Sequence, residues 1–292
     1  MKKSIFAVLV LPMIAASCSD RECEPIATGD FTMTVNARVA NPSSRAGYTI
    51  ENLTEFALIV DNASAPSFNI NTKIVHGTDG WNSFDGAPLL WDNGLNSVDV
   101  IAFAPYRDNV TMTTNNLSIE ALADQSTEDA VLASDFLLMP KTSVKPTASD
   151  KNLNVVLAHK LAKLVIIVKG AKEEINDLKI NGLKLKGTLD LSAAESPVTL
   201  IEETAAVVPF NNDGAFEAIV MPQDLDNNFS ITFKDGDEMY RWTYTGTGSL
   251  EGGRFYTVAL EINKPNQVQL ADDITIGSWN SNNESTYTKF EE

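Results

Sequence analysis

The segment Phe31-Thr-Met-Thr-Val-Asn-Ala-Arg-Val39 alternates apolar and polar side chains almost without a break. Strict alternation is typical of a β-strand, because successive side chains point to opposite faces. One face of the predicted strand carries Phe31, Met33, Val35, Ala37 and Val39. Burying its four large apolar side chains contributes roughly 6–12 kcal/mol gross. This strand therefore predicts the first element of a β-protein with a substantial core.

Two interpretations of this strand stay open. It is either the ordinary first strand of a domain or a strand that is removed after folding. The segment Asn41-Pro-Ser-Ser-Arg45 predicts an accessible loop, with a candidate cleavage site between Arg45 and Ala46. Arg38 is a second basic site. Losing the strand would leave an apolar groove flanked by unpaired backbone amides, a surface that invites a strand from another chain.

Alternation recurs along the rest of the chain, and long helical periodicity is scarce. Short apolar segments are separated by turns such as Asp92-Asn-Gly94 and Glu251-Gly-Gly253. The best helical candidate is 119–133, and 140–150 has the composition of a linker. We therefore predict an all-β protein with two tandem β-sandwich domains, a single large sandwich being the alternative. The predicted parts are a signal peptide over 1–17, a lipidated linker over 18–29, an N-terminal domain over 30–150 and a C-terminal domain over 151–292.

The N-terminus has the features of a bacterial lipoprotein signal. Lys2 and Lys3 precede a short apolar run, which is too short to span a bilayer. The small residues before Cys18 resemble a lipobox, in which the cysteine thiol is acylated and becomes the mature N-terminus. An ordinary cleaved signal with an incidental cysteine is the alternative. The only other cysteine is Cys23, so intrachain disulfides are not expected to hold the fold of the lipidated protein.

The chain is strongly acidic. Its formal net charge is −17, and removal of Lys2 and Lys3 makes it −19. Such a field repels phosphates and anionic membranes, so nucleic acid is not an expected partner. The residues that follow Cys18, Ser-Asp-Arg-Glu-Cys-Glu, resemble the acidic export tag that sends lipoproteins of Bacteroidetes-type bacteria to the cell surface. This resemblance implies a globular body that is anchored by lipid to the outer membrane and exposed at the cell surface.

Catalytic signatures are absent from the sequence: it contains no P-loop, HExxH, GxSxG or CxxC pattern. His159 lies in an apolar run and is interpreted as a hydrogen-bonded core or edge histidine, whereas His76 precedes a turn and is expected to be exposed. The acidic clusters lack the twelve-residue spacing of a calcium loop. We therefore predict a protein that is not an enzyme and has neither a cofactor nor a metal site.

Several short motifs occur in an order that resembles the fimbrillin-like lipoproteins of Bacteroidetes, the family of Mfa-type and FimA-type pilins. They run from Ser44 to Trp279 and comprise Ser-Arg-Ala at 44–46, Leu-Thr-Glu-Phe-Ala-Leu-Ile-Val at 53–60, Asp-Gly-Trp at 79–81, Leu-Leu-Trp at 89–91, Val-Ile-Ala-Phe-Ala-Pro-Tyr at 100–106, Leu-Ala-His-Lys-Leu-Ala-Lys-Leu at 157–164, Val-Met-Pro-Gln at 220–223, Gly-Gly-Arg-Phe-Tyr at 252–256 and Ile-Gly-Ser-Trp at 276–279.

The resemblance implies two transthyretin-like β-sandwich domains and a role as a fimbrial subunit in cell adhesion. It also implies cleavage after an arginine, here Arg45, and filling of the vacated groove by a strand of another subunit. The expected partners are other fimbrial subunits or further copies of this chain. Some members of the family stay outside the polymer, so the tip, stalk or anchor role is left open.

A candidate donor strand lies near the C-terminus. Val268, Leu270, Ile274 and Ile276 share one parity, with Asp272 interrupting them. As with the first strand, the alternative is an ordinary last strand of a sandwich.

A competing functional hypothesis is a glycan-binding surface lipoprotein that serves nutrient uptake. Such a protein needs exposed aromatic platforms, and the candidates are Trp81, Trp91, Trp242 and Trp279. Two or three exposed coplanar rings in one cleft would favour this hypothesis over the fimbrial one.

Overall fold

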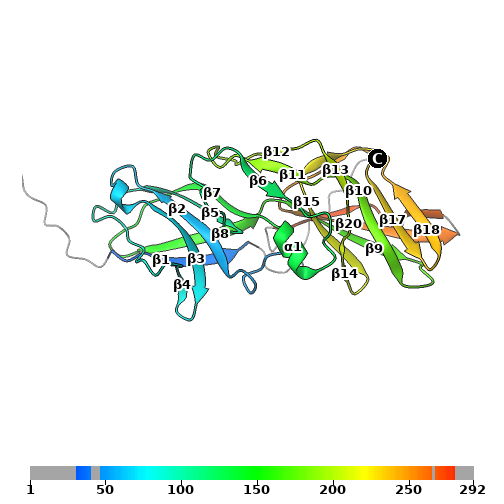
Figure 1. Ribbon diagram of the computed structural model, residues 1–292, viewed down its shortest axis with the longest axis horizontal. Helices are drawn as coiled ribbons and strands as arrows, with labels where there is room; N and C mark the ends of the chain where they lie inside the picture. The colour runs from blue at the N-terminus through cyan, green and yellow to red at the C-terminus, as the bar shows by residue number, and fades with distance from the viewer. Residues whose placement is uncertain (1–30, 41–46, 265–266, 280–292) are drawn as a thin grey trace, which may run out of the picture. The chain divides into compact units, whose positions relative to one another are not determined.

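The computed structural model describes residues 31–40, 47–264 and 267–279 (Figure 1). The predicted signal peptide and linker, and the candidate cleavage site Arg45–Ala46, lie outside the described residues. Within the described ranges, no helix is both long enough and apolar enough to cross a membrane.

Seven strands of the first half close into a barrel, in the order β1-β4-β3-β2-β5-β7-β8. Their bounds are β1 Thr34–Val39, β2 Glu55–Asp61, β3 Ile70–Gly77, β4 Gly80–Ser83, β5 Val98–Ala104, β7 Leu137–Val144 and β8 Asn152–His159. Tight turns connect some neighbours, and Gly80 takes a φ of +99° at the β3–β4 turn, a conformation that favours glycine. Side chains of β1, β2, β5 and β8 alternate into one buried cluster inside this barrel.

The second half contains two sheets that bury one core between them. The first sheet has the order β14-β15-β9-β20-β21, with β22 also paired to β20, and the second has the order β13-β10-β17-β18. The bounds are β9 Ala162–Lys169, β10 Ile175–Lys184, β13 Thr204–Val207, β14 Phe210–Asn212, β15 Ala215–Val220, β17 Ser230–Asp235, β18 Glu238–Thr243, β20 Arg254–Lys264, β21 Gln267–Leu270 and β22 Thr275–Ser278. Buried side chains from both sheets belong to one cluster, which is the packing of a β-sandwich.

Shorter elements complete the described fold. They are the 3₁₀ helix Pro66–Phe68, helix α1 Glu128–Ser134, the sheet of β6 Leu117–Glu120, β11 Lys186–Leu189 and β12 Val198–Leu200, and the pair β16 Gln223–Leu225 and β19 Gly248–Leu250. A third buried cluster joins apolar residues of the barrel strands, such as Phe103, to Ile219 of the sandwich strand β15 and to Met221, which follows that strand.

The structure confirms the all-β prediction and corrects local details. The predicted helix over 119–133 is wrong in its first half, because residues 117–120 pair with β11 and the helix starts only at Glu128. The predicted linker over 140–150 is also wrong in part, since β7 continues to Val144. The predicted division at residue 150 falls between β7 and β8, two strands that pair with each other, and the domain limits stay a prediction.

Candidate functional site

Strand β1 is held on its two sides by unequal ladders. On one side it pairs in parallel with β8 over six residues, from Thr34 opposite Asn152 to Val39 opposite Leu157. On the other side it meets β4 only at Val35, opposite Trp81, and it bonds to the 89–91 segment at its start. Beyond Val35, no strand among the described residues pairs with this second side of β1. The barrel is therefore closed through β1 by a short seam.

The apolar face of β1 points inward, as the alternation predicts. Met33, Val35 and Val39 are buried in the barrel core, whereas Phe31 and Ala37 are half-buried. Burying the three core side chains contributes roughly 5–9 kcal/mol gross, an upper estimate because the unfolded chain already buries part of this surface. Ala37 lies opposite Val155, in the half of β1 that lacks a partner on the β4 side. The structure thus packs Met33, Val35, Val39 and the partly buried Ala37 against the barrel core, whereas half-buried Phe31 lies ahead of β1.

The candidate donor segment runs along the edge of the sandwich, antiparallel to β20. Strand β21 pairs with the end of β20, where Leu270 lies opposite Leu260. Strand β22 pairs with its beginning, where Ile276 lies opposite Tyr256. Asp272 and Asp273 interrupt the two strands, which makes the segment a broken edge strand.

The four predicted donor residues contact the sandwich core to different extents. Ile274 is buried, while Val268, Leu270 and Ile276 are partly buried and pack against the same cluster. Asp272 is exposed and forms an ion pair of 3.1 Å with Lys169, which contributes little because both groups are in water. The edge segment is therefore held mainly by one backbone ladder and by half-covered apolar side chains.

A buried polar cluster, which sequence reasoning missed, lies where β22 ends. His159 Nδ1 is 2.9 Å from Asp135 Oδ2, and both side chains are fully buried. The imidazole stacks on the indole of Trp279, with ring centroids 3.7 Å apart and planes at 7°. The interpretation of His159 as a hydrogen-bonded core histidine agrees with this geometry. Asp135 and Trp279 carried no local signal, because they are far from His159 in sequence.

The segment that follows the candidate cleavage site reaches the same cluster. The Tyr48 backbone N–H donates to Asp135 Oδ2 at 2.9 Å. Gly47 is buried with a φ of +96°, and a Cβ at this position would lie 2.7 Å from the Trp279 ring and 2.9 Å from Asp135 Oδ2. Burial, and secondly the Asp135 charge, raise the pKa of the Tyr48 hydroxyl to about 12.

A buried ion pair lies next to the cluster. Lys163 Nζ is 2.5 Å from Glu217 Oε2, and the ammonium is 6.0 Å from the centre of the Trp279 ring. Burial lowers the pKa of Lys163, and the Glu217 charge opposes that shift. Asn212 Nδ2 donates to the other oxygen of Glu217 at 3.0 Å, which helps to fix the carboxylate.

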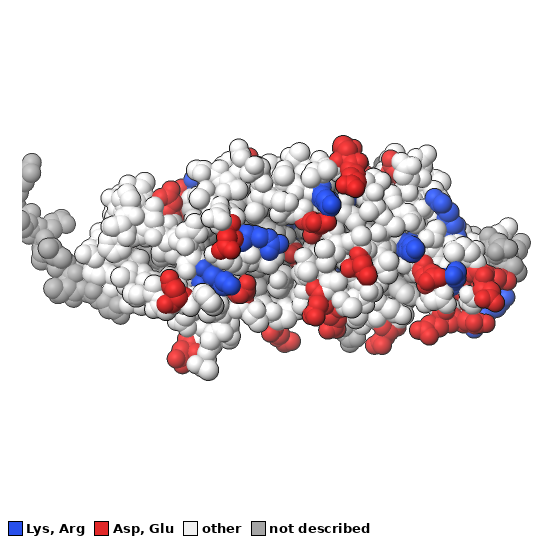
Figure 2. Space-filling view, viewed as in Figure 1, with Lys and Arg blue, Asp and Glu red and all other residues white. Residues whose placement is uncertain are grey.

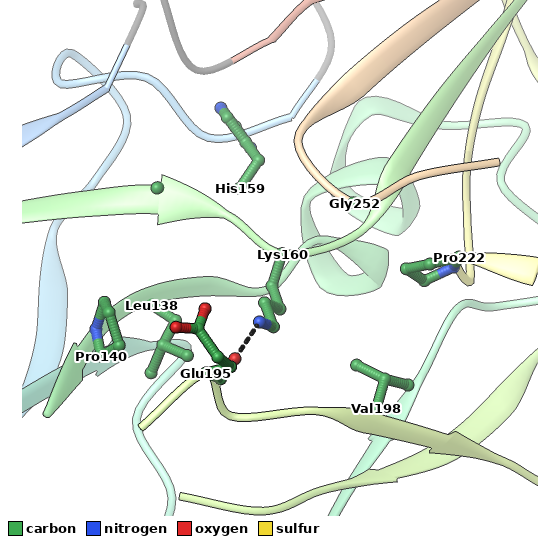
Figure 3. Close-up of a pocket in the computed structure, with 9 residues that line it drawn as sticks. Leu138, Pro140, His159, Lys160, Glu195, Val198, Pro222 and Gly252 are labelled. Atoms are coloured by element: carbon green, nitrogen blue, oxygen red, sulfur yellow. Dashed lines mark hydrogen bonds between the residues drawn. The ribbon is translucent and has the colours of Figure 1, made fainter. Parts of the chain in front are cut away.

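A cavity of about 450 Å³ opens beside the end of β8 (Figure 3). Lys160 extends into it and donates to the Glu195 carbonyl oxygen at 2.9 Å, while Pro140, Val198 and Pro222 contribute apolar wall. Its described lining residues include no Phe, Tyr or Trp. These described residues therefore do not supply the Phe, Tyr or Trp platform on which a sugar would stack.

The candidate aromatic platforms are largely inside the protein. Trp91, Trp242 and Trp279 are buried, and only Trp81 is partly exposed. The Trp81 ring makes edge contacts with Phe56 and with His76, which is exposed as predicted. The described residues therefore do not present the two or three coplanar exposed rings that would favour glycan binding.

On the face shown in Figure 2, acidic side chains gather at the right-hand end, and basic side chains form no comparable cluster. Figure 2 shows Lys and Arg side chains separated from one another by acidic and uncharged residues on the face viewed. Among the described residues, no group of three or more His, Cys, Asp or Glu side chains is arranged to hold a metal ion.

Comparison with known proteins identifies the class to which this fold belongs. Residues 44–279 match the family described as fimbrillin-like. Because the match covers most of the sequence, the chain belongs to the fimbrillin-like family. No curated protein matches the chain significantly.

Solved structures show the same fold. One is a candidate cell adhesion protein from Bacteroides uniformis ATCC 8492, with a TM-score of 0.66 and 17% identity, covering 86% of this chain and 100% of the other. Another is a candidate cell adhesion protein from Bacteroides ovatus ATCC 8483, with a TM-score of 0.62 and 17% identity, covering 85% of this chain and 97% of the other. At these identities the likeness establishes the fold.

Proposed function

We propose that this protein is a fimbrial structural subunit or fimbrillin-like surface lipoprotein in cell adhesion, and that it assembles by strand exchange. Cleavage between Arg45 and Ala46 frees β1 from the chain that follows it. The groove that β1 leaves is then filled by the 268–276 segment of another subunit or of a second copy. The observation that carries this proposal is the packing of β1. Its apolar face is buried in the barrel, but it pairs with β4 at only one residue, so the barrel is closed by a short ladder on that side.

The groove offers both parts of a strand-binding site. Without β1, the backbone groups of β8 that now bond to it lose their partners, which favours adding another strand. The inward side chains of β8 opposite β1 are Leu153, Val155 and Leu157, all fully buried. Exposing them to water is unfavourable, so the open state favours a replacement strand with matching apolar side chains.

The pattern of the donor segment matches this groove in one register. In this register Asp272 takes the place of Ala37. The donor has two apolar residues of the same parity before Asp272 and two after it, so the pattern fits whether the donor runs parallel or antiparallel to β8. Leu270 and Ile274 then take the places of Val35 and Val39, which are buried. Asp272 takes the half-buried position where β1 lacks a partner on the β4 side. Shifting the donor by two residues would instead bury the carboxylate at a core position, which costs several kcal/mol.

The lipid anchor belongs to the same proposal. Acylation of Cys18 holds the precursor at the outer membrane, since several acyl chains anchor firmly at ~0.8 kcal/mol per buried methylene. Cleavage after Arg45 would separate the folded body from that anchor. Exposure at the cell surface agrees with membership of the fimbrillin-like family.

An arginine-specific protease tests the proposal on the chain that starts at Ser19. We expect one early cleavage after Arg45, loss of residues 19–45 from the body, and chains of subunits in electron micrographs. The Arg45→Gln variant should keep β1 joined to the body and stay monomeric, because Arg38 is within the β1–β8 ladder and is protected there, and cleavage after Arg21 would remove only residues 19–21. The matched Arg38→Gln variant should be cleaved and assemble like the parent. A body that is cleaved after Arg45 and stays monomeric would refute strand exchange.

A further inference from the structure

The buried Asp135–His159–Trp279 cluster is contacted by the Gly47–Tyr48 backbone and lies where the candidate donor segment ends. The Gly47–Tyr48 backbone comes directly after the candidate cleavage site and contacts Asp135 and Trp279. Trp279 comes directly after β22, and its backbone N–H donates to the Gly253 carbonyl oxygen at 2.8 Å. One indole therefore lies between the start of the processed chain and the end of the donor segment.

Two separate segments contact the indole. His159 stacks on its face, and the Gly47 backbone approaches so closely that even a methyl group there would overlap the ring. Among the described residues, the buried Trp279 Nε1 has no hydrogen-bond partner. Loss of one wall of this site would favour release of the indole.

We propose that Gly47, Asp135, His159 and Trp279 form a lock that couples the docking of the Gly47–Tyr48 backbone to the retention of β22 in its own sheet. While that backbone is docked, Trp279 is enclosed and β22 stays paired with β20. When it undocks, as after cleavage of the preceding loop, Trp279 loses a wall and the edge segment is released more easily. This inference rests on the proposed function in taking β21 and β22 as the segment that leaves.

The lock predicts a selective effect of Gly47→Ala on uncleaved protein, measured by amide hydrogen exchange. The new methyl group should push against Trp279, so the amides of Thr275–Trp279 should exchange at least about tenfold faster than in the parent. The amides of β9 should keep their protection, which shows that the variant is folded. Gly80→Ala is the matched control: Gly80 has a φ of +99°, but no atom lies within 4 Å of its Cβ position. This control should leave β22 exchange unchanged.

Coupling is reciprocal, so the opposite experiment must agree. Trp279→Leu should accelerate exchange of the Tyr48 amide, whose N–H bonds to Asp135, by at least about tenfold. The control Trp242→Leu removes another buried indole, in the sandwich core, and should not affect Tyr48 selectively. If Gly47→Ala and Gly80→Ala affect β22 equally, or if Trp279→Leu leaves Tyr48 protected, the lock is refuted.

These outcomes are separate from the test of assembly. Selective acceleration in both directions, together with a cleaved protein that stays monomeric, would support the lock and refute strand exchange. Assembly after cleavage without the reciprocal acceleration would support strand exchange and refute the lock.

Discussion

Replacing Leu270 or Ile274 by Asp is expected to raise the critical concentration for assembly of the cleaved protein by at least about a hundredfold. In the proposed register these two side chains enter the positions of Val35 and Val39, which are buried. A carboxylate buried there without a partner costs several kcal/mol, and about 2.7 kcal/mol already corresponds to a hundredfold weaker binding. Sedimentation of the polymer over a series of subunit concentrations measures the effect.

Gln269→Asp is the matched control for this experiment. It introduces the same charge into the same strand at an exposed position of opposite parity. Assembly of this variant should stay within a few-fold of the parent. If Leu270→Asp and Ile274→Asp also assemble normally, the 268–276 segment is not the donor, even if polymers form.

Replacing Glu217 by Ala is expected to lower the free energy of unfolding by about 3–5 kcal/mol, because it leaves the buried Lys163 ammonium without its counterion. The double variant Lys163→Met with Glu217→Leu removes both charges and keeps apolar volume. It should recover most of the lost stability, since apolar replacement of a buried pair is often neutral. Urea unfolding of the parent and of both variants measures the two differences.

Two outcomes would contradict this account of the ion pair. If Glu217→Ala lowers the free energy of unfolding by less than about 1 kcal/mol, the pair contributes no more than an exposed ion pair does. A double variant as unstable as the single one would mean that side-chain shape matters here more than the unpaired charge.

The sequence predicted those parts of the fold that depend on local pattern. Alternation over Phe31–Val39 located β1 and the side chains it buries, and it also located the strands beside tight turns. The sequence pattern did not indicate which strands pair with one another. The parallel pairing of β1 with β8 joins residues more than a hundred positions apart, and an alternating strand fits many neighbours equally well.

The candidate site was predictable to a similar degree. The apolar faces of β1 and of the 268–276 segment follow from parity, and the structure places both against cores. Periodicity distinguishes short helices from short strands poorly, which is why the sequence predicts a helix over 119–133. In the structure, pairing with β11 makes the start of this segment a strand. The Asp135–His159–Trp279 cluster is formed by tertiary contacts between residues far apart in the chain, so no local sequence spacing predicts it.

Cysteine cross-linking tests the central claim, replacement of β1 by the donor segment, most directly. The chain starting at Ser19 with Cys23→Ser has no other thiol, and Val155→Cys with Asp272→Cys places one cysteine in the groove and one in the donor. Val155 is the partner of Ala37, so the proposed register brings the two residues opposite each other, within reach of a disulfide. After cleavage and mild oxidation, the account predicts a covalent ladder of oligomers on a non-reducing gel, with residues 19–45 absent from it. Polymers that form without this ladder, or that retain residues 31–39, would contradict the account.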